Sequence, residues 1–295
     1  MGGNIGNPIL NLKIKKNSYL VIEASSFQLS HSKFICPDYA FLLNITNDHL
    51  DWHGSMTNYK NSKLKIFILQ KKNQFAFINK KLNPIFKKQK FNSQLVIPKK
   101  NEYKKIKKKI KNHYLKSSIN DENMSFVFTF SKLLKINKIS FVSAINSFIG
   151  LPHRYEFFFK KKNIIFINDS KATSFESAKF ALSNSKNVYW ILGGLPKKND
   201  RISFAGIRKN IIKCYLIGKN IKFFQKQIQN KINFSITNNL KKTLIKIFKD
   251  IKVSKSKNNT ILLSPAAASY DQFSSFEKRG DEFKRLSKIY ARKHV

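Results

Sequence analysis

Several polar residues of this 295-residue chain directly follow apolar runs, where their side chains could meet at one edge of a parallel sheet. The first group contains Glu23, Asp48 and His49, with Lys63 in the next helical stretch. A carboxylate and an imidazole that converge there could hold a divalent cation beside phosphate groups. The spacing alone does not distinguish a metal site from ordinary surface residues, with Glu23 and His49 at the surface and Lys63 a solvated helix lysine.

A second group lies in GLPHRYE (150–156) and NDSKAT (168–173). Where a strand ends in hydrogen-bonding groups and a helix begins, backbone N–H groups and Lys171 could bind an anion together. The alternative is a simple helix N-cap by Asp169 or Ser170.

Two further groups are weaker when taken alone. Gly193 and Gly194 follow an apolar run and precede Lys197, and paired glycines let a backbone approach a ligand closely. Residues 263–280 (LSPAAASYDQFSSFEKRG) run from a strand through small residues into a helix with aromatic side chains. A tightly packed strand-to-helix turn would give the same pattern.

The elements that position the first group are predicted from apolar periodicity. Runs 19–23 (YLVIE) and 40–45 (AFLLNI) predict buried strands with polar residues at their carboxyl ends, the edge where open α/β sheets bind ligands. Residues 56–70 and 123–137 have helical patterns, and the lysine-rich stretch 75–114 predicts short strands and loops.

A domain break is predicted at Gly150-Leu151-Pro152. Four apolar runs follow, separated by helical stretches, namely IIFIND, VYWILGG, KCYLIG and TILLSPA. This alternation is typical of a parallel α/β domain. We therefore expect an α/β protein with domains 1–150 and 151–295.

The charge of the chain is strongly positive, with 57 Lys and Arg against 16 Asp and Glu, a net +41. Nucleic-acid binding is one interpretation. The lysines are spread along the chain and accompany many Asn, Ile and Phe residues, so a composition set by A+T-rich coding is the interpretation that we favour over specific nucleic-acid binding. No apolar run approaches the ~20 residues of a membrane span. Only two cysteines occur, Cys36 and Cys214, which fits a reducing, cytoplasmic setting.

Taken together and in this order, GGNIG, IEASSFQL, NITNDHLDWHGSM, YKNSKLKIF, GLPHRYE, NDSKATS and LLSPAAASYDQFSSFEKRGDEF resemble the Mur ligases, within them the D-glutamate-adding members. The resemblance implies a truncated central ATPase-type parallel-sheet domain followed by a Rossmann-like C-terminal α/β domain. It also implies ATP-dependent amide ligation for peptidoglycan biosynthesis by a cytoplasmic monomer. The alanyl carboxylate of UDP-N-acetylmuramoyl-L-alanine would form an acyl phosphate, which the amine of D-glutamate attacks.

The resemblance also implies residue roles. Glu23 matches a magnesium-binding glutamate, and His49 matches a ligand of a second metal. Lys63 matches a lysine that is carbamylated, and its carbamate helps to hold that second metal. These three form the expected catalytic set. Mg²⁺ is the expected metal, with Mn²⁺ as an alternative because nitrogen ligands are unusual for Mg²⁺. Asn4 and Ser25 match the muramoyl-substrate pocket. The matched ATP-binding residues are Asn120, Asn123, Arg154 and Asp169, although NDEN departs from the usual form around both asparagines. The matched D-glutamate residues are Lys171, Thr173, Lys197, Ser269 and Phe276.

One departure concerns the start of the chain. Family members carry a uridine-nucleotide-binding domain and a G-x-x-G-K-[ST] loop before GGNIG, and the sequence contains neither. Since that loop cradles phosphates, we expect little ligase activity from the chain alone. The remaining part would be a separate N-terminal chain, an unrecorded segment or truly absent. Two alternatives stay open: a non-catalytic remnant that binds only D-glutamate or nucleotide, and a basic nucleic-acid-binding protein.

Overall fold

The computed structural model describes residues 2–4, 7–13, 15–46, 49–117, 120–254 and 258–294. The chain divides into two compact units. The first comprises Met1–Lys111 and Asn120–Ile145, and the second comprises Asn112–Ile119 and Asn146–Val295. The expectation of two domains that meet at residue 150 stays a prediction. In the described ranges, no helix is both long and apolar enough to cross a membrane.

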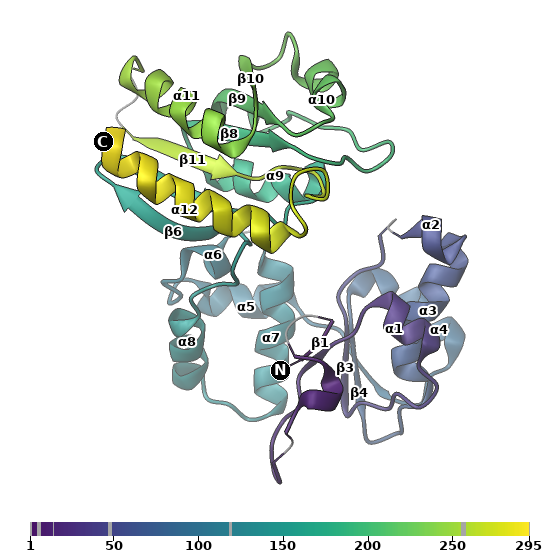
Figure 1. Ribbon diagram of the computed structural model, residues 1–295. Coiled ribbons are helices and arrows are strands. Elements are labelled where there is room, and N and C mark those ends of the chain that lie inside the picture. Colours follow the sequence, from purple (N-terminus) through teal and green to yellow (C-terminus); the bar gives the residue numbers. More distant parts are fainter. Residues whose placement is uncertain are drawn as a thin grey trace. The chain divides into compact units, whose positions relative to one another are not determined.

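Two small parallel sheets form the centre of the first unit (Figure 1). One pairs β1 (Gly2–Gly3) with β2 (Ile22–Glu23), and the other has the order β3 (Tyr39–Leu42), β4 (Phe75–Ile78), β5 (Gln94–Val96). The helices here are α1 (Ser26–His31), α2 (Leu50–His53), α3 (Met56–Ile68), α4 (Asn83–Gln89), α5 (Lys100–Lys107) and α7 (Asp121–Leu133). Helix α8 (Lys138–Ser147) follows them in the chain.

Helices cover both faces of the three-stranded sheet. Alternate strand residues point to opposite faces, so each face contributes its own side chains to the packing. On one face Ile78 lies in a buried cluster with Phe67 of α3. On the other, the rings of Phe41 and Phe77 stack with centroids 4.5 Å apart, and Phe130 of α7 meets both edge-on. The strand ends of this sheet are therefore held on a well-packed core.

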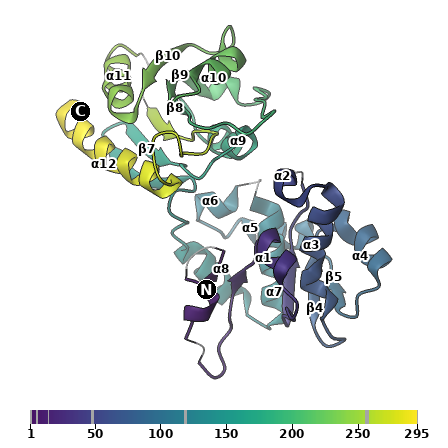
Figure 2. The ribbon, with the colours of Figure 1, turned by 45° about the vertical axis from the view of Figure 1, so that its right-hand side comes forward.

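The second unit contains a six-stranded sheet in the order β10-β9-β8-β11-β7-β6 (Figures 1 and 2). Its strands are β6 (Glu156–Lys161), β7 (Ile164–Asn168), β8 (Val188–Gly193), β9 (Ile211–Ile217), β10 (Phe234–Asn238) and β11 (Asn259–Leu263). All neighbouring pairs are parallel except β6 and β7. Its helices are α6 (His113–Lys116), α9 (Phe175–Asn184), α10 (Ile221–Ile228), α11 (Leu240–Lys252) and α12 (Phe276–His294).

Strand β8 shows how this sheet is buried on both faces. Trp190 and Leu192 belong to the cluster that α9 and α10 cover, whereas Tyr189 and Ile191 belong to the cluster that α11 and α12 cover. The indole of Trp190 donates a hydrogen bond to the Ser264 carbonyl oxygen at 2.7 Å. Both faces of this strand are therefore apolar, as expected of a central parallel strand.

The expected α/β fold class is confirmed, and the four apolar runs after residue 150 are strands β7, β8, β9 and β11. Edge strands β6 and β10 were not predicted from the sequence. The expectation of a buried strand at 19–23 was wrong, since only Ile22–Glu23 is paired and residues 19–23 are exposed. The prediction of strands and loops at 75–114 missed helices α4 and α5.

Candidate functional site

Three loops at the carboxyl edge of the six-stranded sheet carry the residues that were matched to D-glutamate. The loop after β7 contains Lys171 and Thr173, the loop after β8 contains Lys197, and the loop after β11 contains Ser269. The fifth residue, Phe276, begins α12 directly after the β11 loop. Parallel strands end at a common edge, so the fold brings these loops to one side of the second unit.

Lys171 and Phe276 lie in direct contact. The Lys171 ammonium is 4.9 Å from the centroid of the Phe276 ring, a cation–π geometry. The imidazole of His153 meets the same ring edge-on, with centroids 5.9 Å apart. The Lys171 backbone N–H donates to the His153 carbonyl oxygen at 3.1 Å, which fixes the turn that presents the lysine.

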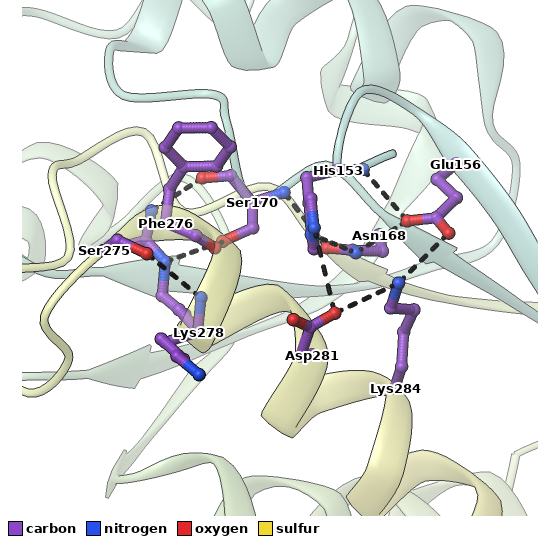
Figure 3. A network of polar contacts seen from close by, with 10 residues as sticks. His153, Glu156, Asn168, Ser170, Ser275, Phe276, Lys278, Asp281 and Lys284 are labelled. Carbon is purple, nitrogen blue, oxygen red and sulfur yellow. Dashed lines mark hydrogen bonds and ion pairs between the residues drawn. The ribbon is translucent and has the colours of Figure 1, made fainter. Parts of the chain in front are cut away.

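Figure 3 shows the buried polar network that supports this pair. The Asn168 amide nitrogen lies 3.0 Å from His153 Nδ1 and donates to Glu156 Oε2 at 2.9 Å. Glu156 also accepts from the His153 backbone N–H at 2.9 Å and from Lys284 of α12 at 3.3 Å. Burial, with a contribution from Lys284, lowers the pKa of His153, so its imidazole is held neutral.

The loops after β8 and β11 are joined through their backbones. Leu195 and Ala268 exchange two N–H···O=C hydrogen bonds, each 2.9 Å long. Gly193 (φ 139°) and Gly194 (φ 137°) have conformations that favour glycine. An added Cβ would meet the Ile217 carbonyl oxygen at Gly193 and the Ala268 carbonyl oxygen at Gly194. The glycine pair therefore allows the close approach of neighbouring backbones.

Ser269 is buried within this edge, and its carbonyl oxygen accepts from the Gln272 and Phe273 N–H groups at 3.1 and 2.9 Å. Thr173 is partly exposed and Lys197 is exposed. Helix α9 is N-capped by Ser174, so the interpretation of Asp169 or Ser170 as its cap was wrong.

Asp169 is a buried carboxylate beneath these loops. It accepts from the Ser264 hydroxyl at 2.7 Å and from the Tyr155 N–H at 3.0 Å. Burial raises the pKa of Asp169 to about 7, against the opposing effects of these hydrogen bonds and of the Arg154 charge. Arg154 is exposed beside it. Through its hydrogen bond from Ser264, Asp169 links the end of β7 to the end of β11. Of Asp169 and Arg154, only Arg154 is exposed to a ligand in solution.

Glu23 and Asn4 lie together in the first unit. The Asn4 backbone N–H donates to the Glu23 carbonyl oxygen at 2.7 Å, and the Asn4 amide donates to Glu23 Oε1 at 3.3 Å. Both side chains are exposed. Ser25 follows and N-caps α1 in a capping box with Gln28. The strand end and the helix start are thus held, but the carboxylate is accessible.

His49 and Lys63 meet around Tyr59 of α3. The Lys63 ammonium lies 4.8 Å from the Tyr59 ring centroid, and it donates to the Asn44 carbonyl oxygen at 3.3 Å. The His49 ring lies 6.5 Å from the Tyr59 ring and 4.8 Å from that of Phe27. His49 is the N-cap residue of α2, and its backbone conformation is left-handed (φ 54°).

Whether these residues suit a metal depends on their donor atoms. Across the residues that the structure describes, no three His, Cys, Asp or Glu side chains are grouped to hold an ion. Asp48 lies outside the described residues. His49 and a carbamate on Lys63 would supply one nitrogen and one oxygen to one cation, and Glu23 would supply an oxygen to another. Such a set fits Mg²⁺ if substrate phosphates and water complete the shell.

Asn120 and Asn123 lie at the start of α7 in the first unit. Asn120 is buried and Asn123 is exposed. Arg154 and Asp169 belong to the second unit, so the four predicted ATP-binding residues come from both units.

Arg279 and His153 are the main residues of this edge that the sequence analysis did not single out. Both lie in the quoted motifs, FEKRG and GLPHR. An arginine three residues into a helix looks like an exposed cation, yet Arg279 is only 1% exposed. The following Gly280 was the available signal, since glycine inside a helix indicates close packing.

Comparison with known proteins gives consistent matches. Residues 4–146 match the Mur ligase middle domain. The UDP-N-acetylmuramoylalanine–D-glutamate ligase of Rickettsia felis is 35% identical over 308 residues, covering 98% of this chain and 68% of that protein. The enzyme of the same name from the Wolbachia of Brugia malayi is 35% identical and covers 97% and 69%.

Solved structures resemble the fold. MurF from Acinetobacter baumannii matches with a TM-score of 0.62 and 12% identity, covering 92% of this chain and 64% of that one. MurF ligase from Thermotoga maritima, solved in complex with ADP, matches with a TM-score of 0.57 and 14% identity, covering 88% and 63%. The chain therefore spans about two thirds of the length of the proteins it matches.

Proposed function

Because the chain belongs to the Mur ligase family, we propose that it joins D-glutamate to UDP-N-acetylmuramoyl-L-alanine in an ATP-dependent amide ligation of peptidoglycan biosynthesis. The alanyl carboxylate attacks the γ-phosphorus of ATP and ADP leaves, which gives an acyl phosphate. The neutral amine of D-glutamate then attacks the acyl carbon. The tetrahedral intermediate expels phosphate and leaves the amide. This chemistry belongs in the cytoplasm, where ATP and the nucleotide precursor are available.

The observation that carries this proposal is that three loops at the carboxyl edge of the second unit present two lysines, two hydroxyl side chains and an aromatic ring. An amino dicarboxylate needs cations and hydroxyl donors at both of its ends. Lys171 and Lys197 supply cations, and Thr173 and Ser269 supply hydroxyl groups. Phe276 holds the Lys171 ammonium over its ring, 4.9 Å from the centroid. We assign these five residues to D-glutamate.

The first unit is assigned to phosphates and to the muramoyl substrate. Glu23 would hold one divalent cation, and His49 with Lys63 as a carbamate would hold a second, with Mg²⁺ or Mn²⁺ as the ions. When bound, these ions neutralise phosphate charge. In the unmodified chain the Lys63 ammonium lies over the Tyr59 ring, a contact that carbamylation would displace. Asn4 and Ser25 would face the muramoyl substrate. Asn120, Asn123, Arg154 and Asp169 would contribute to the ATP site.

Ligation is tested with purified protein, UDP-N-acetylmuramoyl-L-alanine, ATP and Mg²⁺, in the presence of D- or L-glutamate. Phosphate release and product mass are measured. Ligation predicts phosphate release and a glutamyl product that depend on the muramoyl substrate and on the D-isomer, in this arm or in the arm described next. Equal turnover with L-glutamate would contradict the assignment.

A second arm adds the part of the Rickettsia felis relative that lies outside the matched region. Ligation only in this arm would indicate that the activity requires a separate partner chain. Calorimetric binding of D-glutamate without product in either arm would replace ligation by the binding-only alternative. If neither D-glutamate binding nor a glutamyl product is detected, the proposal fails.

A further inference from the structure

Arg279 is a buried guanidinium at the centre of the carboxyl edge, although it lies on α12 close to the surface. Its Nε donates to the Ser170 hydroxyl at 3.0 Å, and its Nη2 donates to the carbonyl oxygens of Ser170 and Ala267 at 2.7 and 2.9 Å. One planar side chain therefore joins the loop after β7 to the loop after β11. The fork geometry is what lets a single residue reach both.

The connection extends to the remaining parts of the site. Ala268, next to Ala267, is hydrogen-bonded to Leu195 in the loop after β8. The Ser170 hydroxyl, which accepts from Arg279, itself donates to the Phe276 carbonyl oxygen at 2.8 Å (Figure 3). Lys171, Lys197, Ser269 and Phe276 are thus each within two residues of a group in this hydrogen-bonded set.

The charge of Arg279 is not neutralised by an ion pair. Within the described ranges no carboxylate lies within ion-pair distance of it, and Nη1 has no hydrogen-bond partner. Asp271 is close enough to act on it electrostatically, while burial lowers the pKa of Arg279 to about 10. The guanidinium is therefore still cationic at neutral pH. A buried, unpaired positive charge acts on nearby anions with little solvent screening.

Building on the proposed D-glutamate ligation, we infer that Arg279 is the positioning residue of the amino-dicarboxylate site. It holds the three loops in register and adds a positive potential beneath them, without touching the substrate. Loss of Arg279 should therefore weaken the use of D-glutamate specifically. Nucleotide use should change less, because the hydrogen bonds of Arg279 go to Ser170 and Ala267 in the loops assigned to D-glutamate.

The kinetic test compares Arg279→Met, Arg279→Lys and a control, Arg285→Met, in the ligation-competent protein. Arg285 is on the same helix but is exposed and pairs with Glu282 at 2.8 Å. We expect Arg279→Met to raise KM for D-glutamate at least about tenfold with KM for ATP within about twofold. Arg279→Lys should fall between wild type and Met, because it keeps the charge but not the fork. Equal increases in both KM values, or an unchanged KM for D-glutamate, would overturn the inference.

A second measurement does not depend on ligation. Amide hydrogen exchange of Leu195 and Ala268 should be at least about tenfold faster in Arg279→Met than in Arg285→Met, because their mutual hydrogen bonds lose the support of Ala267. Unchanged protection would show that Arg279 does not join the loops, and would overturn the inference. Arg279→Lys carries both measurements if the Met variant fails to fold. If wild type makes no glutamyl product, the ligation proposal fails while the exchange result still decides the role of Arg279.

Discussion

The two units hold their predicted site residues in contrasting ways. In the second unit, Lys171 and Phe276 rest on buried groups such as Asn168 and Arg279, each with several hydrogen bonds. In the first unit, Glu23 is exposed and its side chain is bonded by the exposed Asn4. The residues proposed to bind the dicarboxylate are therefore fixed in place by the protein, whereas the residue proposed to act beside the phosphates is accessible to solvent.

This contrast follows from the chemistry that each side is proposed to perform. An amino acid with two carboxylates brings no other cation with it, so the protein must fix its own donors in place. A nucleotide arrives with Mg²⁺ and water, which complete a site built from one or two protein ligands. Rigid support is then less necessary around Glu23 and His49. Four substitutions test whether this difference is real.

Lys63→Ala should have the largest effect, because it removes the residue proposed to gain a carboxylate. We expect turnover to fall by at least about 10³-fold, comparable to the loss of a group that stabilises transition-state charge. Added acetate or formate should restore part of the activity by supplying the missing oxygen ligand. Lys60→Ala on the same helix is the control. Turnover close to wild type in the Lys63 variant would contradict the metal-site assignment. The comparison between the two units would then lose its proposed site in the first unit.

Asp169→Asn should test the buried carboxylate that supports the second unit, through the dependence of stability on pH. The folded pKa of about 7 exceeds the reference value of 3.8, so the folded state keeps a proton that the unfolded state has lost. Wild-type stability attributable to Asp169 is thus full below about pH 4 and is lost as pH rises to about 7. We expect the stability of Asp169→Asn relative to wild type to increase by about 4 kcal/mol between pH 4 and pH 8.

Asp250→Asn supplies the control of opposite sign. Burial acts to raise the pKa of Asp250, but hydrogen bonds from Lys213 and Tyr215 leave it lowered overall. Its stabilising contribution is therefore present at neutral pH and lost in acid. Urea unfolding between about pH 2 and about pH 8 measures both variants, because the contribution of Asp250 is lost only below about pH 4. The same pH trend in both would show that burial does not dominate at Asp169.

The loops of the second unit were predictable because parallel strands end at one edge, so NDSKAT, LGG and LSPAAAS had to meet there. The role of Arg279 was not predictable, since its acceptors are 109 and 12 residues away and are backbone carbonyls of unremarkable residues. The run 19–23 reads as a buried strand because of its apolar side chains, yet Leu20 and Val21 are exposed. Apolar pattern predicts that a segment can be covered, not which neighbour covers it.

Gly280→Ala tests how tightly the second unit is packed. Helix propensity alone predicts stabilisation by about 1 kcal/mol. An added Cβ would lie 2.2 Å from His153 Nδ1 and 2.9 Å from the Asn168 amide, both held in the network. We therefore expect destabilisation by about 2–3 kcal/mol, measured by urea unfolding. Gly206→Ala, which meets nothing within 4 Å, is the control and should cost only about 1 kcal/mol from its positive φ. A more stable Gly280→Ala protein would mean that His153 and Asn168 can move to accommodate the added methyl group at little cost.

The smallest effect, and the most direct comparison, comes from one asparagine in each unit. Asn168→Ala removes a fully buried amide that contacts His153 and Glu156 and accepts from the Ser170 N–H at 3.2 Å. It should destabilise the second unit by about 2 kcal/mol, because buried partners lose their hydrogen bonds. Asn4→Ala removes an exposed amide and should change stability by less than about 0.5 kcal/mol.

The two tryptophans, Trp52 in the first unit and Trp190 in the second, allow each unit to be followed separately in Trp190→Phe and Trp52→Phe backgrounds. If both asparagine variants lose similar stability, the first unit is as firmly organised around Glu23 as the second is around Lys171. The greater exposure of Glu23 and Asn4 would then reflect only their position on the surface. It would no longer support the idea that Mg²⁺, water and nucleotide complete the site in the first unit.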